Sequence, residues 1–237
     1  MIGGHPGGAR LTGRLLALAG ADGPSGAGAK ARSGMPPAAS PGRKEAERAL
    51  VLGAGTGESV RCLRALGYDA VGIDLDAGGD GGGASADGTA FVIRGDMTAL
   101  PFADGSFDLC LAECSVSVCG DGPAALGEAY RVLRPGGSLL LSDVFFHKED
   151  APHLSMPAPL TCSCWEQELR RVGFAVRRSS DETALWREFF LEWLWADSPD
   201  PAGCDFYREA CKAGCGYFVA LLQKADAQGG SAGKDAG

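Results

Sequence analysis

The sequence predicts an α/β fold with a doubly wound, mostly parallel sheet of seven strands. Short apolar runs alternate with segments whose apolar residues recur at helical spacing, and turns rich in glycine or proline separate them. This alternation favours parallel strands joined by right-handed helical crossovers. The chain has 237 residues, 45% of them hydrophobic, which is enough for one well-buried domain or two small ones.

The strands and helices are predicted in order along the chain. The strands are a run from Ala49, 69–76, about 90–94, 106–114, 138–145, a run from Phe174, and 216–224. The helices are 10–19, 57–67, 126–133, 165–172 and 184–195. Residues 134–137, RPGG, are predicted as the turn that leads into the fifth strand.

Composition divides the chain into three parts. Residues 20–45, rich in Gly, Ala, Pro and Ser, have little to bury and are predicted as a linker after an N-terminal helix. The globular domain is expected over 46–226, with a glycine-rich loop at 77–88, and 227–237 is expected to be a disordered tail. The four tryptophans lie in the C-terminal part and are expected mainly to pack helices on the sheet.

Charge and hydropathy indicate which classes of binding partner to expect. The net charge of −8 disfavours nucleic acid and anionic membranes, which reward a basic face. No stretch approaches the roughly 20 apolar residues that span a bilayer. Residues 10–19 faintly resemble a signal peptide, but Gly13 and Arg14 interrupt the apolar part, so an amphipathic helix and a cytoplasmic location are expected. A small-molecule partner is therefore predicted.

A glycine-rich turn is the first candidate site. Gly53, Gly55 and Gly57 form G-x-G-x-G between a strand and a helix, where a ligand can approach the backbone closely. A dinucleotide site would need glycine at Glu58, and the Gly-Lys-Ser/Thr of a P-loop is absent. Asp74, at the end of the second strand, could accept hydrogen bonds from two ribose hydroxyls. An ordinary turn and a helix N-cap are the alternatives for these features.

Four motifs in order carry a family resemblance: LGAGTG (52–57), GID (72–74), GDMTALPFADGSFD (95–108) and YRVLRPGG (130–137). Over residues 49–145 the chain resembles the class I S-adenosylmethionine-dependent methyltransferases, in particular the type 11 small-molecule group. The resemblance implies a last strand antiparallel to the others and S-adenosylmethionine as cofactor. It also implies the cofactor-binding residues Gly53, Ala54, Gly55, Gly57, Asp74, Leu75, Asp96, Met97 and Glu113. Asp96 could instead be a turn residue.

One position departs from the family. An acidic residue usually stands two positions before the first glycine, where this chain has Val51. A polar contact to the methionine amine is therefore expected to be missing.

The sequence indicates less about the methyl acceptor than about the cofactor. Oxygen and carbon acceptors usually need a base, but His147 and His153 are expected in a surface loop. The Asn-Pro-Pro-Tyr signature for nucleobase amines is absent, since AECS (112–115) stands in its place. The stretch 113–145 is similar to arsenite methyltransferases, and this similarity implies a thiophilic acceptor near Cys114, the predicted catalytic residue.

The cysteines suggest free thiols rather than disulfides. There are nine, an odd number, and none is spaced as in a zinc ribbon or a ferredoxin. Cys110 and Cys114, four apart on a predicted strand, are expected on the same side of the sheet. Cys62 and Cys110 are expected to be core residues, and a thiol role is considered for Cys114, Cys162, Cys164, Cys204, Cys211 and Cys215.

Two other functions are weighed against the methyltransferase. The first is a non-catalytic adenosyl-ligand or metal-binding subunit with a redox-protein partner. The second is a dinucleotide oxidoreductase, which Glu58 disfavours.

Overall fold

The structure, a computed structural model, describes residues 8–20, 46–77, 91–147, 161–194 and 208–226. The predicted linker, glycine-rich loop and tail lie almost wholly outside these residues, as do His153 and Cys204. Within the described ranges, no helix is both long and apolar enough to cross a membrane.

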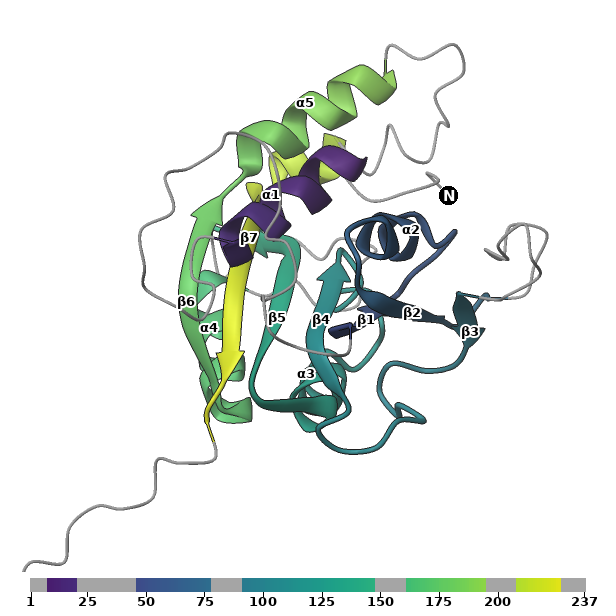
Figure 1. Ribbon diagram of the computed structural model, residues 1–237. Coiled ribbons are helices and arrows are strands. Elements are labelled where there is room, and N and C mark those ends of the chain that lie inside the picture. Colours follow the sequence, from purple (N-terminus) through teal and green to yellow (C-terminus); the bar gives the residue numbers. More distant parts are fainter. Residues whose placement is uncertain (1–7, 21–45, 78–90, 148–160, 195–207, 227–237) are drawn as a thin grey trace, which may run out of the picture.

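A seven-stranded sheet with the order β3-β2-β1-β4-β5-β7-β6 forms the centre of the molecule (Figure 1). The first five strands are parallel, and β7 runs antiparallel to both β5 and β6. The strands are β1 (Arg48–Leu52), β2 (Asp69–Asp74), β3 (Val92–Arg94), β4 (Phe107–Glu113), β5 (Leu133–Phe146), β6 (Phe174–Asp181) and β7 (Cys215–Lys224). The predicted fold class, including the antiparallel last strand, is confirmed.

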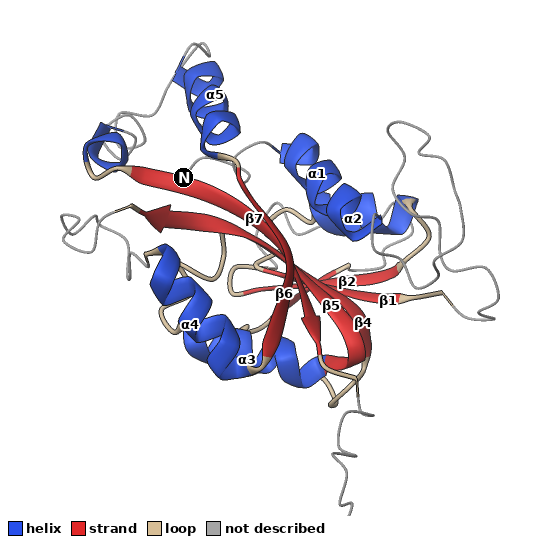
Figure 2. Ribbon diagram, turned by 90° about the vertical axis from the view of Figure 1, so that its left-hand side faces the viewer, coloured by secondary structure: helices blue, strands red, loops and turns tan. Residues whose placement is uncertain are grey.

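Helices cover both faces of this sheet (Figure 2). They are α1 (Gly8–Gly20), α2 (Glu58–Ala65), α3 (Gly122–Val132), α4 (Cys162–Val172) and α5 (Thr183–Leu194). Helices α1, α2 and α5 lie on one face, and α3 and α4 lie on the other. Alternate strand residues serve the two layers: Val51 packs with the first group, whereas Leu50 and Leu52 pack with the second.

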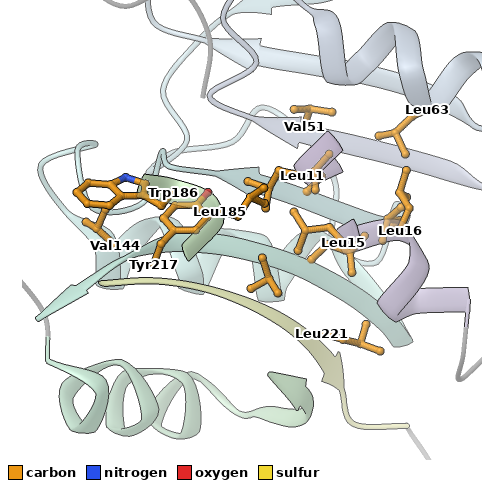
Figure 3. Packing of buried hydrophobic residues seen from close by; sticks show 14 of the residues in the cluster. Leu11, Leu15, Leu16, Val51, Leu63, Val144, Leu185, Trp186, Tyr217 and Leu221 are labelled. Atoms are coloured by element: carbon orange, nitrogen blue, oxygen red, sulfur yellow. The ribbon is translucent and has the colours of Figure 1, made fainter. Parts of the chain in front are cut away.

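Helix α1 is part of the first core layer. Its apolar side buries Leu11, Leu15 and Leu16 completely or almost completely, while Arg14 on the opposite side pairs with Glu182. Figure 3 shows these leucines in one cluster with residues of β1, α2 and β7. The amphipathic helix expected at 10–19 is therefore present and supplies core side chains.

Two helices start earlier than their apolar spacing predicts. The Asp121 side chain accepts a hydrogen bond from the amide of Ala124 at 3.0 Å, and Thr161 accepts one from Cys164 at 3.3 Å. Each side chain thus caps the first turn of α3 or α4. The cap residues, and not the first apolar residues, set these helix starts.

The predicted turn at 134–137 lies inside β5. Phe107 pairs with Leu133, but the next pair along the ladder is Leu109 with Ser138, so the four residues form a bulge. Gly136, with φ 73°, supplies the left-handed residue that this bulge needs. The strand therefore continues where the sequence predicts a turn.

The predicted packing role of the tryptophans holds for two of them. Trp165 of α4 is 3% exposed and its indole donates to the Val144 carbonyl at 3.0 Å. Trp186 of α5 is 1% exposed in the opposite layer. The two side chains pack α4 and α5 against opposite faces of the sheet.

Candidate functional site

The predicted site residues meet at the carboxyl ends of four adjacent parallel strands. The glycine turn follows β1, Asp74 ends β2, Asp96 follows β3, and Cys114 follows β4. The chain runs from β1 outward to β3 on one side and returns through β4 on the other, so the sheet order reverses between β1 and β4. In doubly wound sheets, ligands bind in the crevice outside such a reversal.

The glycine turn is tightly packed at one end and open at the other. Gly53, Gly55 and Gly57 have φ values of 68°, 50° and 77°, which side chains rarely tolerate. A Cβ at Gly53 would stand 2.5 Å from the Cβ of Ser115, whereas a Cβ at Gly55 would meet no atom of the described residues within 4 Å. The turn therefore faces open space at Gly55, where a ligand could approach the backbone.

Four amides of the turn are bound within the protein. They donate from Gly53 and Ala54 to the Ile73 carbonyl (2.9 and 3.0 Å), from Gly55 to Asp74 Oδ2 (2.8 Å) and from Gly57 to the Ala54 carbonyl (2.8 Å). A phosphate cradle needs such amides to point at the ligand. These four amides therefore do not point at a ligand.

Asp74 connects the turn to the end of β2. Its two carboxylate oxygens accept from the amides of Gly55 (2.8 Å) and Asp76 (2.9 Å). A carboxylate can accept about four hydrogen bonds, so capacity for two vicinal hydroxyls remains. Residues 75–77, the last described ones before the gap at 78–90, form a turn. Leu75, 55% exposed, offers an apolar surface beside this carboxylate.

Asp96 and Met97 lie next to this end of β2. The Gly95 amide donates to the Asp74 carbonyl at 3.0 Å, which joins the two strand ends. Asp96 Oδ1 accepts from the amide and hydroxyl of Thr98 (2.8 and 2.7 Å), and these bonds lower the pKa of the Asp96 carboxyl. Asp96 therefore stabilises a turn through Oδ1. Its side chain is exposed, so Oδ2 could accept a hydrogen bond from a ligand.

Glu113, the last residue of β4, forms hydrogen bonds with two helices. Its carboxylate accepts from the hydroxyls of Thr12 in α1 (2.9 Å) and Ser59 in α2 (2.6 Å), and all three side chains are buried. Val51, on the neighbouring strand, is 2% exposed among apolar side chains. The buried carboxylate near the glycine turn therefore comes from β4 and not from β1.

Cys114 adopts an unusual backbone conformation for a residue with a side chain. Its φ is 50°, in the left-handed region, and its thiol donates to the Tyr217 hydroxyl at 3.2 Å. Tyr217 in turn donates to Ser142 Oγ at 2.9 Å. Burial, followed by the charge of Asp143, raises the pKa of the Cys114 thiol well above its usual value.

The prediction that Cys110 and Cys114 face the same side of the sheet is wrong. Cys110 lies in the layer of α3 and α4, whereas Cys114 packs against the layer of α1, α2 and α5. The reason is that β4 ends at Glu113 and the left-handed residue that follows breaks the alternation. Only Cys114 therefore lies at the site.

The remaining described cysteines are spread over several elements. Cys215 is the first residue of β7 and pairs with Phe146, so it lies at the same end of the strands as Cys114. Burial raises the pKa of the Cys215 thiol to about 12. Cys162 and Cys211 are exposed, and Cys62 is partly buried on α2. In the described ranges, no three His, Cys, Asp or Glu side chains are grouped to hold a metal ion.

Sequence reasoning did not single out Asp143. It lies near the end of β5, is fully buried, and accepts from the amides of Ser117 (3.0 Å) and Val144 (2.8 Å). Burial raises the pKa of this carboxyl to about 6, against the lowering effect of these hydrogen bonds. The available signal was the polar pair Ser142 and Asp143 between two apolar runs, 139–141 and 144–146.

The fold is that of the class I methyltransferases. The structure resembles that of geranyl diphosphate C-methyltransferase from Streptomyces coelicolor A3(2), with a TM-score of 0.64 and 14% identity over 76% of this chain and 71% of that one. It also resembles a (4+2)-cyclase, SpnF, with a TM-score of 0.56 and 22% identity over 76% and 75% of the two chains. At these identities the likeness concerns the fold alone, because one fold supports several reactions.

Residues 50–141 match the family described as a methyltransferase domain, so the predicted resemblance is confirmed over the site. Malonyl-(acyl-carrier protein) O-methyltransferase of Serratia marcescens is 31% identical over 139 residues, 52% of this chain and 54% of the relative. Arsenite methyltransferase of Aquipseudomonas alcaligenes is 36% identical over 99 residues, 38% of this chain and 29% of the relative. The chain thus spans about half, or less, of the curated relatives it matches.

Proposed function

We propose that the protein transfers a methyl group from S-adenosylmethionine to a small molecule. The observation that carries the proposal is the convergence of the open glycine turn, Asp74 and Asp96 at adjacent strand ends, within the segment that matches the methyltransferase domain. The relatives named above do not point to the redox-protein partner considered from the sequence.

The residues fit this cofactor in three respects. Asp74 has remaining capacity for two ribose hydroxyls, and exposed Leu75 offers an apolar face to a purine. The bound amides of the turn suit a ligand without pyrophosphate. S-adenosylmethionine supplies an electrophilic methyl group on a sulfonium, and the protein's part is to hold an acceptor in line with that methyl in a dry site.

Calorimetric titration with S-adenosylhomocysteine tests the cofactor site. We expect micromolar binding that Asp74→Ala weakens roughly 10- to 100-fold, since hydrogen bonds to a charged group are lost. Asp76→Ala, which removes an exposed neighbouring carboxylate, serves as the control and should bind as the unchanged protein does. The absence of binding by the unchanged protein, or equal binding by Asp74→Ala, would contradict the proposal.

We further propose that the acceptor is thiophilic, with trivalent arsenic as the first to test. Cys114 lies at the site, and Cys215 lies at the same end of the strands. Two thiols in this region favour a soft acceptor, because sulfur ligands select soft ions. A thiol can condense with an arsenic hydroxide to give an S–As bond and water, so the raised pKa of Cys114 does not prevent binding. Bound S-adenosylmethionine would supply the methyl: an As–CH3 bond would form from the arsenic lone pair as the S–CH3 bond breaks, S-adenosylhomocysteine would leave, and no base would be needed.

Methylation assays distinguish this acceptor from oxygen and carbon acceptors. With arsenite and isotope-labelled S-adenosylmethionine, we expect labelled methylarsenic products that Cys114→Ser abolishes while S-adenosylhomocysteine binding persists. Cys162→Ser, which removes an exposed thiol, is the control. Turnover of a carboxylate or ring-carbon acceptor that survives Cys114→Ser would overturn the thiophilic assignment and leave the cofactor site intact.

A further inference from the structure

Ser115 places a buried hydroxyl at the crevice between β1 and β4. The residue is 6% exposed, and its Oγ has no hydrogen-bond partner within the described part of the chain. A Cβ built on Gly53 would stand 2.5 Å from its Cβ and 3.2 Å from its Oγ. The hydroxyl therefore lies directly against the first glycine of the turn, on the β4 side.

A buried hydroxyl without a partner costs stability, so one at a ligand crevice points to a partner that arrives with the ligand. Six neighbouring donors of the described residues already have partners within the protein. The amides of Gly53, Ala54, Gly55 and Gly57 are bound within the protein, and the hydroxyls of Thr12 and Ser59 donate to Glu113. An acceptor group that enters the crevice on the β4 side thus meets Ser115 as a donor.

We propose that Ser115 is a binding residue that donates a hydrogen bond to the carboxylate of the ligand's amino-acid portion. The inference rests on the proposed function. With the ribose at Asp74 on β2, the ligand extends across β1 toward β4, a distance of two strand spacings or about 10 Å. This length places the amino-acid end, and not the adenosine, beside Ser115.

A ligand pair that differs only in the amino-acid portion tests the assignment. In calorimetry, Ser115→Ala should bind S-adenosylhomocysteine about 10-fold or more weakly, because a hydrogen bond to a charged group is lost. Binding of 5′-methylthioadenosine, which lacks the amino acid, should change less than about twofold. Ser117→Ala is the matched control, since Ser117 is also 6% exposed and lies on the same segment.

Stability of the ligand-free protein gives a second readout. Ser115→Ala should unfold at the same or higher denaturant concentration than the unchanged protein, because it removes a polar group that has no partner. A lower unfolding midpoint, unchanged S-adenosylhomocysteine affinity, or an equal loss for both ligands would overturn the role of Ser115. If the unchanged protein bound neither ligand, the proposed function would fail together with the inference.

Discussion

Gly53 and Gly55 share a left-handed backbone but differ in their surroundings. Their φ values are 68° and 50°, yet a Cβ would collide with Ser115 only at Gly53. The first glycine is therefore required by both backbone and packing, whereas the second is required by the backbone alone.

Alanine substitutions should separate these two requirements. Gly55→Ala should lower the free energy of unfolding by about 1–2 kcal/mol, the cost of a left-handed residue with a side chain. Gly53→Ala should lower it by about 2–5 kcal/mol, because overpacking adds to that cost. Urea unfolding of both variants measures the difference, and equal losses would show that the contact with Ser115 relaxes freely.

The sequence placed the glycine turn and Asp74 at adjacent strand ends because their signals are local. The spacing of Gly53, Gly55 and Gly57 after a strand, and Asp74 at the end of the next, depends only on neighbouring residues. Ser115 and Asp143 could not be assigned, since their importance comes from burial against other strands. The face of Cys114 was mispredicted because a single left-handed residue overrides strand alternation.

At the scale of elements, α1 is joined to the site by a buried polar contact. The Thr12 hydroxyl donates to Glu113, whose carboxylate also accepts from Ser59 of α2. On the outer side of the helix, Arg14 pairs with Glu182. The sequence predicted the helix from its amphipathic pattern. It could not predict this docking, because the partners lie 101 residues apart in the chain.

Two substitutions on α1 compare the buried contact with the exposed one. Thr12→Val keeps the side-chain shape but removes a donor to a buried carboxylate, so it should cost about 1–3 kcal/mol of unfolding free energy. Arg14→Ala should cost less than about 1 kcal/mol, because exposed ion pairs contribute little. Thermal or urea unfolding ranks the two, and a larger loss for Arg14→Ala would refute this account of the helix.

At the scale of the whole molecule, Asp143 makes stability depend on pH. Burial raises the pKa of its carboxyl from 3.8 to about 6, so the folded state binds a proton more tightly than the unfolded chain. The resulting stabilisation is fully present below about pH 4 and is lost as the pH rises through about 6. The shift of two units corresponds to a loss of about 3 kcal/mol.

Asp143→Asn should remove this dependence. Between pH 4 and pH 7, the change in unfolding free energy of the variant should differ from that of the unchanged protein by about 3 kcal/mol. The unchanged protein should lose more stability on going to pH 7. Urea unfolding at several pH values measures both curves, and parallel curves would mean that Asp143 keeps an ordinary pKa when folded.

The position of α1 also determines when the chain can complete its core during synthesis. This helix packs on β5 and on β7, so the earliest described element rests on the last strand. At roughly 5–20 residues per second, translation needs about 10–40 s to proceed from the end of α1 to β7. Throughout that interval β7 is not yet available to α1, so the apolar side of this helix cannot be fully buried.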